Sequence, residues 1–381
     1  MRTKKFLSLL LSAAMAFSLL TATAFAAAPA EEENSFFDFL LGKKYTYLYA
    51  ALTWDEYWAN EKVYAAGSTA ASAQLDSHEE QDLGAFDAVS RATVNQIITD
   101  STIDMDHKMI EELGLTVVPL RFTIDGKTYK DKADLSDMPT ETFYAKLREG
   151  KMSTTSQINA DEFTRVFEPV LQGGEDVLYI AFSSGLSGTC QSAFIARDEL
   201  KEKYPERKIY VFDSLCASLG EGLLVYHAAM LKRAGTDIDS LYKWLGENVL
   251  KLCHWFTVDD LNHLKRGGRV SATAALVGTL LGVKPVLHVD DEGHLIPVSK
   301  VRGRRQSLDA LVQKMEETAI QPADQTVFIS HGDCLADAEY VANRVREKFG
   351  VKNIYINFVG PVIGAHSGPG TVALFFIGEH R

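Results

Sequence analysis

Short apolar runs alternate with amphipathic stretches from about Gln96 onward. Short runs of mostly apolar residues indicate strands, and stretches with apolar residues three or four positions apart indicate helices. We expect strands at 97–99, 116–119, 177–182 and 209–212, with helices at 161–171 and 192–203. Strands that alternate with helices are typical of a parallel sheet covered by helices. The pattern therefore predicts an N-terminal α/β domain over residues 96–245.

The second half of this region mixes strand runs with helices in a less regular order. The pattern predicts strands at 255–258, 286–289, 327–330 and 354–358, and helices at 308–318 and 336–349. We therefore predict a second α/β domain, with a mixed sheet, over residues 246–381. The fold class expected for the chain is α/β, with two α/β domains.

The first twenty-six residues have the pattern of a secretory signal peptide. Arg2, Lys4 and Lys5 precede an apolar run, and the segment ends in Ala24-Phe25-Ala26, which suits signal peptidase. We expect residues 1–26 to be cleaved and the protein to be secreted or associated with the envelope. No transmembrane segment is expected after cleavage, since no later stretch holds eighteen apolar residues in a row. An uncleaved membrane anchor is the alternative for this segment, and the protein is cytoplasmic if the signal is not used.

Residues 27–95 form a small acidic module that is rich in aromatic residues. Twelve acidic side chains stand against Lys43, Lys44, Lys62 and Arg91, so the module carries most of the chain's net charge of −12. Trp54, Tyr57 and Trp58 recur at helical spacing, which is typical of a packing face. The run from 45 to 93 resembles a piece of a penicillin-binding lipoprotein family. We interpret it as a packing or interaction module.

Composition and missing motifs exclude several classes of function. The chain has 381 residues, of which 46% are hydrophobic and 24% charged, so it is an ordinary globular sequence. The net negative charge of the chain argues against a nucleic-acid partner. The four cysteines form no CxxC pair, and the sequence contains no Walker A loop, dinucleotide fingerprint or HExxH. A zinc ribbon, a dithiol redox site and these cofactor sites are therefore unsupported.

Four polar or glycine-rich segments are placed where strands of the predicted sheets end. They are 155–157, 183–189, 213–214 and 364–370. Ligands bind at the carboxyl ends of parallel strands, and hydroxyl groups with backbone N–H groups at a helix N-terminus form an anion cradle. A serine hydrolase that uses Ser187, His366 and Asp213 is one interpretation. Hydroxyls around a carboxylate, with one histidine, suit binding an anion, and we prefer binding to turnover.

These segments belong to a longer series of motifs that resembles the DegV family, over about residues 96–381. The series also includes a lysine- and arginine-rich turn and a short basic strand end. In order, the motifs are Asp100-Ser101-Thr102, Val118-Pro119-Leu120, Thr155-Ser156-Gln157, Ser183 to Thr189, Asp213-Ser214, Leu264 to Ser271, Lys284-Pro285, Val301-Arg302-Gly303, His331-Gly332-Asp333 and Gly364 to Gly370.

The resemblance implies a non-catalytic fatty-acid-binding protein with the acyl chain in a tunnel between the two α/β domains. In the family, such a protein presents the fatty acid to a separate ATP-dependent fatty acid kinase as an acyl-phosphate carrier. The implied ligands of the carboxylate are Thr155, Ser156, Ser187 and His366, with backbone from Gly188. Arg269 and Arg302 match family arginines near the mouth, where a kinase would dock.

The bound fatty acid is the only ligand that the resemblance implies, with no cofactor or metal. The apolar candidates for the tunnel wall are Phe122, Phe182, Leu219, Leu276, Leu280 and Leu281. Typical members of the family lack the N-terminal signal and acidic module, and they act in the cytoplasm, where ATP is. An exported protein would be an extracellular or envelope lipid binder. The hydrolase and an interaction protein that acts through residues 27–95 stay as alternatives.

Overall fold

The computed structural model describes residues 95–271 and 282–381, which belong to one compact unit, Glu79–Arg381. The predicted signal peptide and the acidic module up to residue 94 lie outside the described residues. So do the tunnel-wall candidates Leu276, Leu280 and Leu281, and all of these stay predictions. None of the helices in the described part of the chain is long and apolar enough to span a bilayer.

A four-stranded parallel sheet organises the first half, as the alternating pattern predicted. Its order is β2 (Thr116–Val118), β1 (Asn95–Asp100), β6 (Asp176–Ala181) and β7 (Ile209–Asp213). The other elements here are η1 (Ser101–Ile103), α6 (His107–Leu113), α7 (Thr140–Arg148), α8 (Ala160–Gln172), α9 (Thr189–Lys203), α10 (Leu219–Arg233), α11 (Ile238–Asn248) and η2 (Val249–Lys251).

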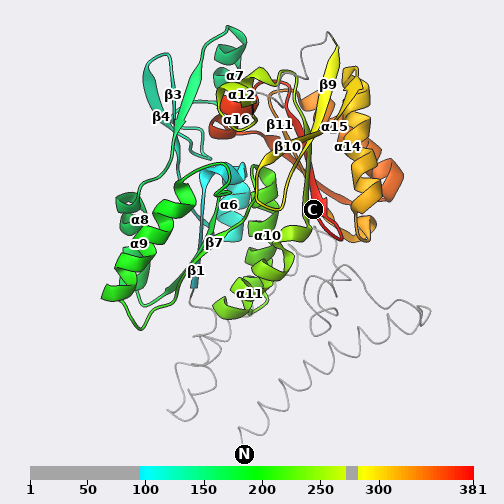
Figure 1. The fold of residues 1–381 in the computed structure, drawn as a ribbon. Coiled ribbons are helices and arrows are strands. Elements are labelled where there is room, and N and C mark those ends of the chain that lie inside the picture. Colours follow the sequence, from blue (N-terminus) through cyan, green and yellow to red (C-terminus); the bar gives the residue numbers. More distant parts are fainter. Residues whose placement is uncertain (1–94, 272–281) are drawn as a thin grey trace, which may run out of the picture. The chain divides into compact units, whose positions relative to one another are not determined.

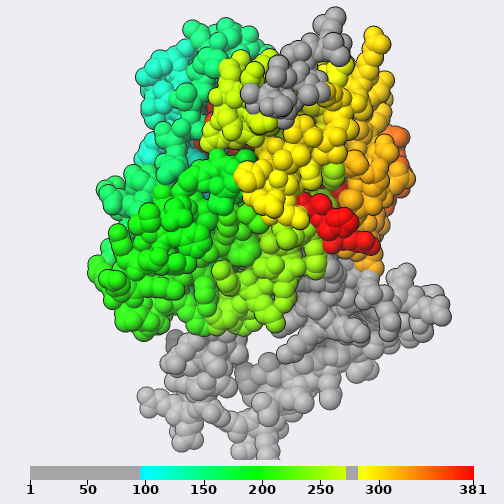
Figure 2. Space-filling model, viewed as in Figure 1, coloured from blue at the N-terminus to red at the C-terminus, as the bar shows by residue number. Residues whose placement is uncertain are grey.

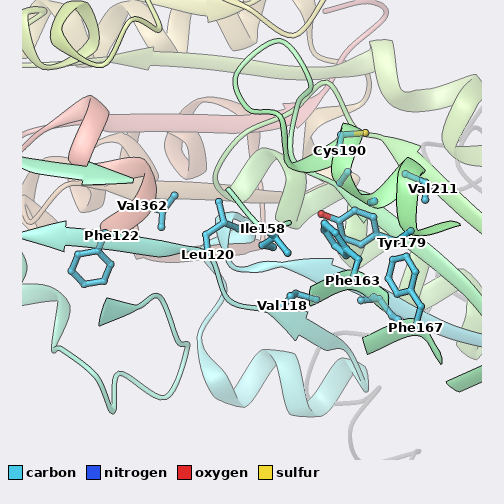
Figure 3. Close-up of a cluster of buried hydrophobic side chains, with 14 of the residues drawn as sticks. Val118, Leu120, Phe122, Ile158, Phe163, Phe167, Tyr179, Cys190, Val211 and Val362 are labelled. Carbon is cyan, nitrogen blue, oxygen red and sulfur yellow. The ribbon is translucent and has the colours of Figure 1, made fainter. Parts of the chain in front are cut away.

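Helix α8 covers this sheet because its apolar stripe faces β6. Asn159 and Glu162 form a capping box that starts the helix. The rings of Phe163 and Phe167 lie 4.8 and 5.8 Å from the ring of Tyr179 on β6 (Figure 3). The Tyr179 hydroxyl donates to the Asp100 carboxylate at 2.6 Å, so the polar end of this buried ring is also paired.

A second, antiparallel sheet in the first half was not predicted. It has the order β4 (Lys127–Lys130), β3 (Arg121–Ile124) and β5 (Ser153–Ser156). Thr155 and Ser156 therefore lie on a strand of this small sheet, and the prediction that they lie in a loop at the end of a parallel strand was wrong. The signal was weak because β5 reads Ser-Thr-Thr-Ser, which has no apolar residue to mark a strand.

A six-stranded mixed sheet organises the second half, again as predicted. Only β11 and β12 pair in parallel, and the other neighbours are antiparallel. The strand order is β10 (Leu295–Arg302), β9 (Val283–Val289), β8 (Leu252–Thr257), β13 (Val372–Ile377), β11 (Thr326–His331) and β12 (Asn353–Phe358). The helices of this half are α12 (Asn262–Arg266), α14 (Arg304–Thr318), η4 (Pro322–Asp324), α15 (Leu335–Phe349) and α16 (Pro361–Ser367).

The two faces of the mixed sheet have different neighbours. Trp255, Ile329 and Leu374 face a core that is covered by α14 and α15 (Figure 1). The opposite face meets α10, which contacts β8, β11 and β13 and also β6 of the parallel sheet. Nearly all of α10 is buried for this reason. Figure 2 shows the two halves, in cyan to green and in yellow to red, meeting in one continuous surface.

Candidate functional site

A cavity of about 200 Å³ lies between the two halves of the described unit. The second half supplies its floor from the face of the mixed sheet that α14 and α15 do not cover. The strand register places Phe256 opposite Ala373, and His254 opposite Phe375. All four line the cavity, as does Leu295 from the edge strand β10. The floor is therefore mostly apolar, with one histidine in it.

The five residues predicted to hold a carboxylate all line this one cavity. Thr155 and Ser156 come from β5, and Ser187 and Gly188 from the loop that leads into α9. His366 comes from the last turn of α16 in the second half. The structure thus brings together residues that the sequence separates by up to 211 positions.

His366 is the centre of the polar end of the cavity. Its Nε2 lies 2.8 Å from Oγ1 of Thr155. Its Nδ1 is buried and has no hydrogen-bond partner among the described residues. Burial, together with the nearby charge of Arg269, lowers the pKa of His366 to about 4. The imidazole is therefore neutral at ordinary pH, with one N–H donor and one acceptor nitrogen.

Two glycines make room for the polar end. A Cβ on Gly267 would lie 2.1 Å from His366 Nδ1, and a Cβ on Gly188 would lie 2.3 Å from Oε1 of Gln157. Gln157, which also lines the cavity, is thus packed directly against the start of α9. Side chains larger than glycine at these two positions would displace residues of the site.

The Ser187 hydroxyl is held at the N-terminus of α9. It lies 2.9 Å from the hydroxyl of Thr189 and accepts from the Thr189 N–H at 3.2 Å. Gly188 is the residue before the first turn of this fifteen-residue helix. The N-terminus of a helix favours an anion, because its backbone N–H groups and the helix dipole both point toward it.

Arg269 and Arg302 lie in different surroundings. Arg269 lines the cavity, and its guanidinium donates to the backbone oxygens of Leu186 and Gly267. Burial lowers the pKa of Arg269, but an arginine stays charged. Arg302 is exposed at the end of the edge strand β10. Arg269 is therefore part of the cavity wall, where it adds a positive charge to the polar end, and Arg302 is a surface residue.

The hydrolase triad that we considered is not assembled. Asp213 accepts from the backbone N–H groups of Ser184 and Leu215, at 3.1 and 3.0 Å. Within residues 95–271 and 282–381, no carboxylate makes a hydrogen bond to His366. A catalytic histidine needs a third group that orients it toward the nucleophile. This arrangement suits binding better than ester hydrolysis.

The tunnel-wall candidates have mixed outcomes. Phe182 lines the cavity, as predicted. Phe122 is part of the core of the first half, and Leu219 is fully buried at the start of α10, so neither faces the cavity. Sequence reasoning missed His254 and Ser330, which do line it. A lone histidine or serine in an apolar strand gives no signal of its own in the sequence.

A second hollow opens beside the polar end of the cavity. It shares Thr155, Arg269 and His366 with the cavity, and adds Lys151 and Arg266. Positive side chains thus surround the outer side of the polar end. In the described part of the chain, no group of three or more His, Cys, Asp or Glu side chains could hold a metal ion.

Two family profiles match the chain. The profile described as an uncharacterised protein of the DegV family matches residues 95–379. The profile described as domain a of the penicillin-binding protein Tp47 matches residues 42–129, so its end overlaps the first strands of the fold. The curated relatives include a DegV domain-containing protein of Clostridium perfringens. It is 49% identical over 285 residues, which are 75% of this chain and 98% of the relative.

Solved structures with the same fold include two from thermophilic bacteria. One is a DegV lipid-binding protein from Thermotoga maritima, with 30% identity and a TM-score of 0.67 over 75% of this chain and 99% of that one. Another is a DegV family protein from Thermus thermophilus, described for fatty acid binding. It has 30% identity and a TM-score of 0.66 over 74% of this chain and 99% of that one.

Proposed function

Because the chain belongs to the DegV family, we propose that it binds a long-chain fatty acid in the cavity between its two halves. The observation that carries the proposal is the composition of the cavity. One end gathers hydroxyls, a neutral histidine and an arginine, and the floor is mostly apolar. The descriptions of the related proteins from T. maritima and T. thermophilus support the same ligand class.

The carboxylate lies at the polar end in this proposal. Thr155 Oγ1 and His366 Nε2 are close enough that one carboxylate oxygen can contact both. Ser156, Ser187 and the backbone of Gly188 surround the second oxygen. A hydrogen bond to a charged group contributes about 1.5–3 kcal/mol, which fixes the orientation of the ligand. Arg269 supplies the countercharge that a buried carboxylate needs.

The acyl tail supplies most of the affinity. Each buried methylene is worth about 0.8 kcal/mol before the costs of association are subtracted. The side chains that the tail would contact are those of the sheet floor, such as Phe256, Ala373 and Phe375. No charge changes when these apolar side chains are buried, so the tail contribution should be insensitive to pH.

Native mass spectrometry of the protein purified without added lipid tests the proposal. We expect a stoichiometric fatty acid that is lost in the triple variant Thr155→Ala/Ser187→Ala/His366→Ala. A matched triple variant at exposed positions, Thr128→Ala/Ser184→Ala/His107→Ala, should keep it. A protein that stays ligand-free after incubation with several fatty acids would overturn the proposal.

We further propose that the bound fatty acid is phosphorylated on its carboxylate by a separate ATP-dependent kinase, with the protein as the carrier. In this step a carboxylate oxygen attacks the γ-phosphorus of ATP and ADP leaves. The product, an acyl phosphate, carries more negative charge than the carboxylate. Lys151, Arg266 and Arg269 line the outer hollow, and in this proposal they contact that charge. Incubation of the loaded protein with a fatty acid kinase and labelled ATP should yield an acyl phosphate.

The compartment decides whether such a kinase can reach the protein. If residues 1–26 direct export, we propose that the protein binds fatty acid in the envelope or outside the cell, away from ATP. Fractionation of cells that express the full chain, with an intact mass of the mature form, distinguishes the two cases. A mass that begins at Ala27 in the exported fraction supports the envelope role.

The serine hydrolase is tested on the same sample. A fatty ester that is hydrolysed by the protein, with activity abolished in Ser187→Ala, would establish it. Loss of affinity in Ser187→Ala without any turnover in the parent protein supports binding.

A further inference from the structure

One side chain in the floor of the cavity does not suit an unsubstituted acyl tail. His254 lies on β8 in the apolar floor, and its ring centroid is 5.2 Å from that of Phe375. It is 1% exposed, and neither Nδ1 nor Nε2 has a hydrogen-bond partner among the residues that the structure describes. A buried polar group without a partner is costly, so natural proteins rarely retain one without a reason.

The backbone makes room for this histidine. A Cβ on Gly220 would lie 2.2 Å from Cε1 and 2.3 Å from Nε2 of His254. Only glycine at the start of α10 therefore allows the imidazole to occupy this place. Burial, with the charge of Arg381 adding to it, lowers the pKa of His254 well below its usual value. The ring is neutral, so it offers one N–H donor and one acceptor nitrogen.

A second polar group of the cavity floor comes from β11. Ser330 lies opposite Ala373 on the same face of the sheet as His254, and both line the cavity. Ser330 is held in place by the Ser218 hydroxyl at 2.9 Å, and Ser218 is bound in turn to the carboxyl group of Asp104. A serine hydroxyl has one hydrogen and two lone pairs, so Ser330 keeps hydrogen-bonding capacity for a ligand.

Of these two residues, His254 lies further from the carboxylate end. Thr371, which accompanies Ser367 and His366, lines the cavity at that end. His254 lies opposite Phe375, four residues further along. At about 3.3 Å per residue of strand, the separation along the sheet is roughly 13 Å. A fatty acid anchored at His366 would therefore pass His254 with its chain.

We propose that His254 forms a second polar subsite, which binds a hydroxyl group carried on the acyl chain, so that hydroxy fatty acids are preferred ligands. The inference rests on the proposed function, because it needs a fatty acid whose carboxylate lies at the His366 end. A hydroxyl group both donates and accepts, which matches the neutral imidazole. An unsubstituted chain in the same position leaves both imidazole nitrogens unpaired. Sites built to bind a hydroxyl discriminate strongly against the analogue that lacks it.

The test compares octadecanoic acid with its monohydroxy isomers, in which the hydroxyl is moved stepwise along the chain. Displacement of a fluorescent fatty acid from the full chain gives the dissociation constants. We expect an isomer with the hydroxyl in the interior of the chain to bind about tenfold or more tightly than octadecanoic acid. Isomers with the hydroxyl at other positions should bind more weakly than that one.

Substitutions of His254 test whether its side chain causes the preference for hydroxy fatty acids. His254→Leu should abolish the preference for the hydroxy isomer and tighten the binding of octadecanoic acid. His254→Asn keeps a donor and an acceptor, so it should retain part of the preference. His288→Leu is the matched control, since this histidine stacks on Trp255 on the other face of the sheet. If His254→Leu does not fold, the isomer series on the unsubstituted protein still decides.

The outcomes separate this inference from the proposed function. Equal binding of octadecanoic acid and all its isomers would overturn the subsite and leave fatty acid binding intact. If octadecanoic acid binds more tightly than every isomer, the subsite is likewise overturned and fatty acid binding stands. If neither the parent acid nor any isomer binds, both the subsite and the proposed function are wrong.

Discussion

Thr155 and His366 are joined by a contact of 2.8 Å between Oγ1 and Nε2, although 211 positions separate them in the chain. Thr155 lies on β5 of the small antiparallel sheet, and His366 in the last turn of α16. Each half of the unit thus supplies one member of the pair. The polar end of the cavity exists only when the two halves are packed together.

Removal of either member should weaken fatty acid binding. We expect Thr155→Val and His366→Phe each to raise the dissociation constant about tenfold or more, because each loses a hydrogen bond to a charged group. In a double-mutant cycle the two changes should not be additive, since both contact the same carboxylate oxygen. Fluorescent fatty acid displacement provides the measurement. Additive effects of the two substitutions, or no effect of either, would show that the carboxylate binds elsewhere. Thr128→Val, at an exposed position, is the control.

Gly267 should be required for the position of His366. In Gly267→Ala the new Cβ would meet His366 Nδ1 at 2.1 Å, so the imidazole must move away from Thr155. We expect a loss of fatty acid affinity with a small change in thermal stability. Gly246→Ala is the matched control, because no atom lies within 4 Å of a Cβ there and the position is exposed in α11.

The control variant Gly246→Ala has an expected outcome of its own. Alanine is better than glycine in a helix interior by about 0.5–1 kcal/mol, so Gly246→Ala should be more stable than the parent and bind normally. Equal affinity loss in both variants would show that the effect of Gly267→Ala is not local to His366.

Acid should destabilise the protein through His366, relative to a variant that lacks the imidazole. The folded-state pKa of His366 is lowered from 6.5 to about 4, chiefly by burial. The unfolded chain therefore takes up a proton near pH 6.5 and the folded protein does not. The contribution of neutral His366 to the free energy of unfolding is present above pH 6.5 and is lost as the pH falls toward 4. Between pH 7 and pH 5 the expected loss is about 2 kcal/mol.

Urea unfolding of the parent and of His366→Asn at both pH values measures this loss. Burial acts in the opposite direction on Asp131, whose pKa it raises to about 7, but both proteins contain Asp131 and its contribution cancels in the difference. A difference between the two proteins that does not change with pH would show that His366 titrates normally in the folded state.

The two arginines should separate lipid binding from kinase docking. Arg269→Gln should weaken fatty acid binding about tenfold, because it removes the positive charge in the cavity wall. Arg302→Gln should leave the affinity unchanged, since Arg302 is exposed on the edge strand, and should lower the rate of acyl phosphate formation with a kinase. Displacement titrations and a coupled kinase assay give the two readouts. Loss of fatty acid affinity in Arg302→Gln would contradict the assignment.

The apolar pattern predicted most, but not all, of the strands that are buried and apolar. It located β1, β6, β7, β8, β11 and β12 within a few residues, because each presents a short apolar run between polar loops. It missed β13, although that strand is apolar and fully buried. It also missed β3 and β4, together with β5, which consists of serine and threonine, and β10, which contains Pro297 and is mostly exposed. Such strands form because neighbouring strands pair with them, which local sequence does not reveal.

The sequence by itself determined the family, through a series of short motifs in a fixed order, and the residue types that line the polar end of the cavity. Only the tertiary structure decided which residues meet. It placed Arg269 in the cavity wall and Arg302 on the surface, and it brought His254 and Ser330 to the apolar floor. The physical reason is that the order of apolar and polar residues along the chain determines whether a residue lies in a strand or a helix. Sheet register and the packing of the two halves determine which residues become its neighbours in space.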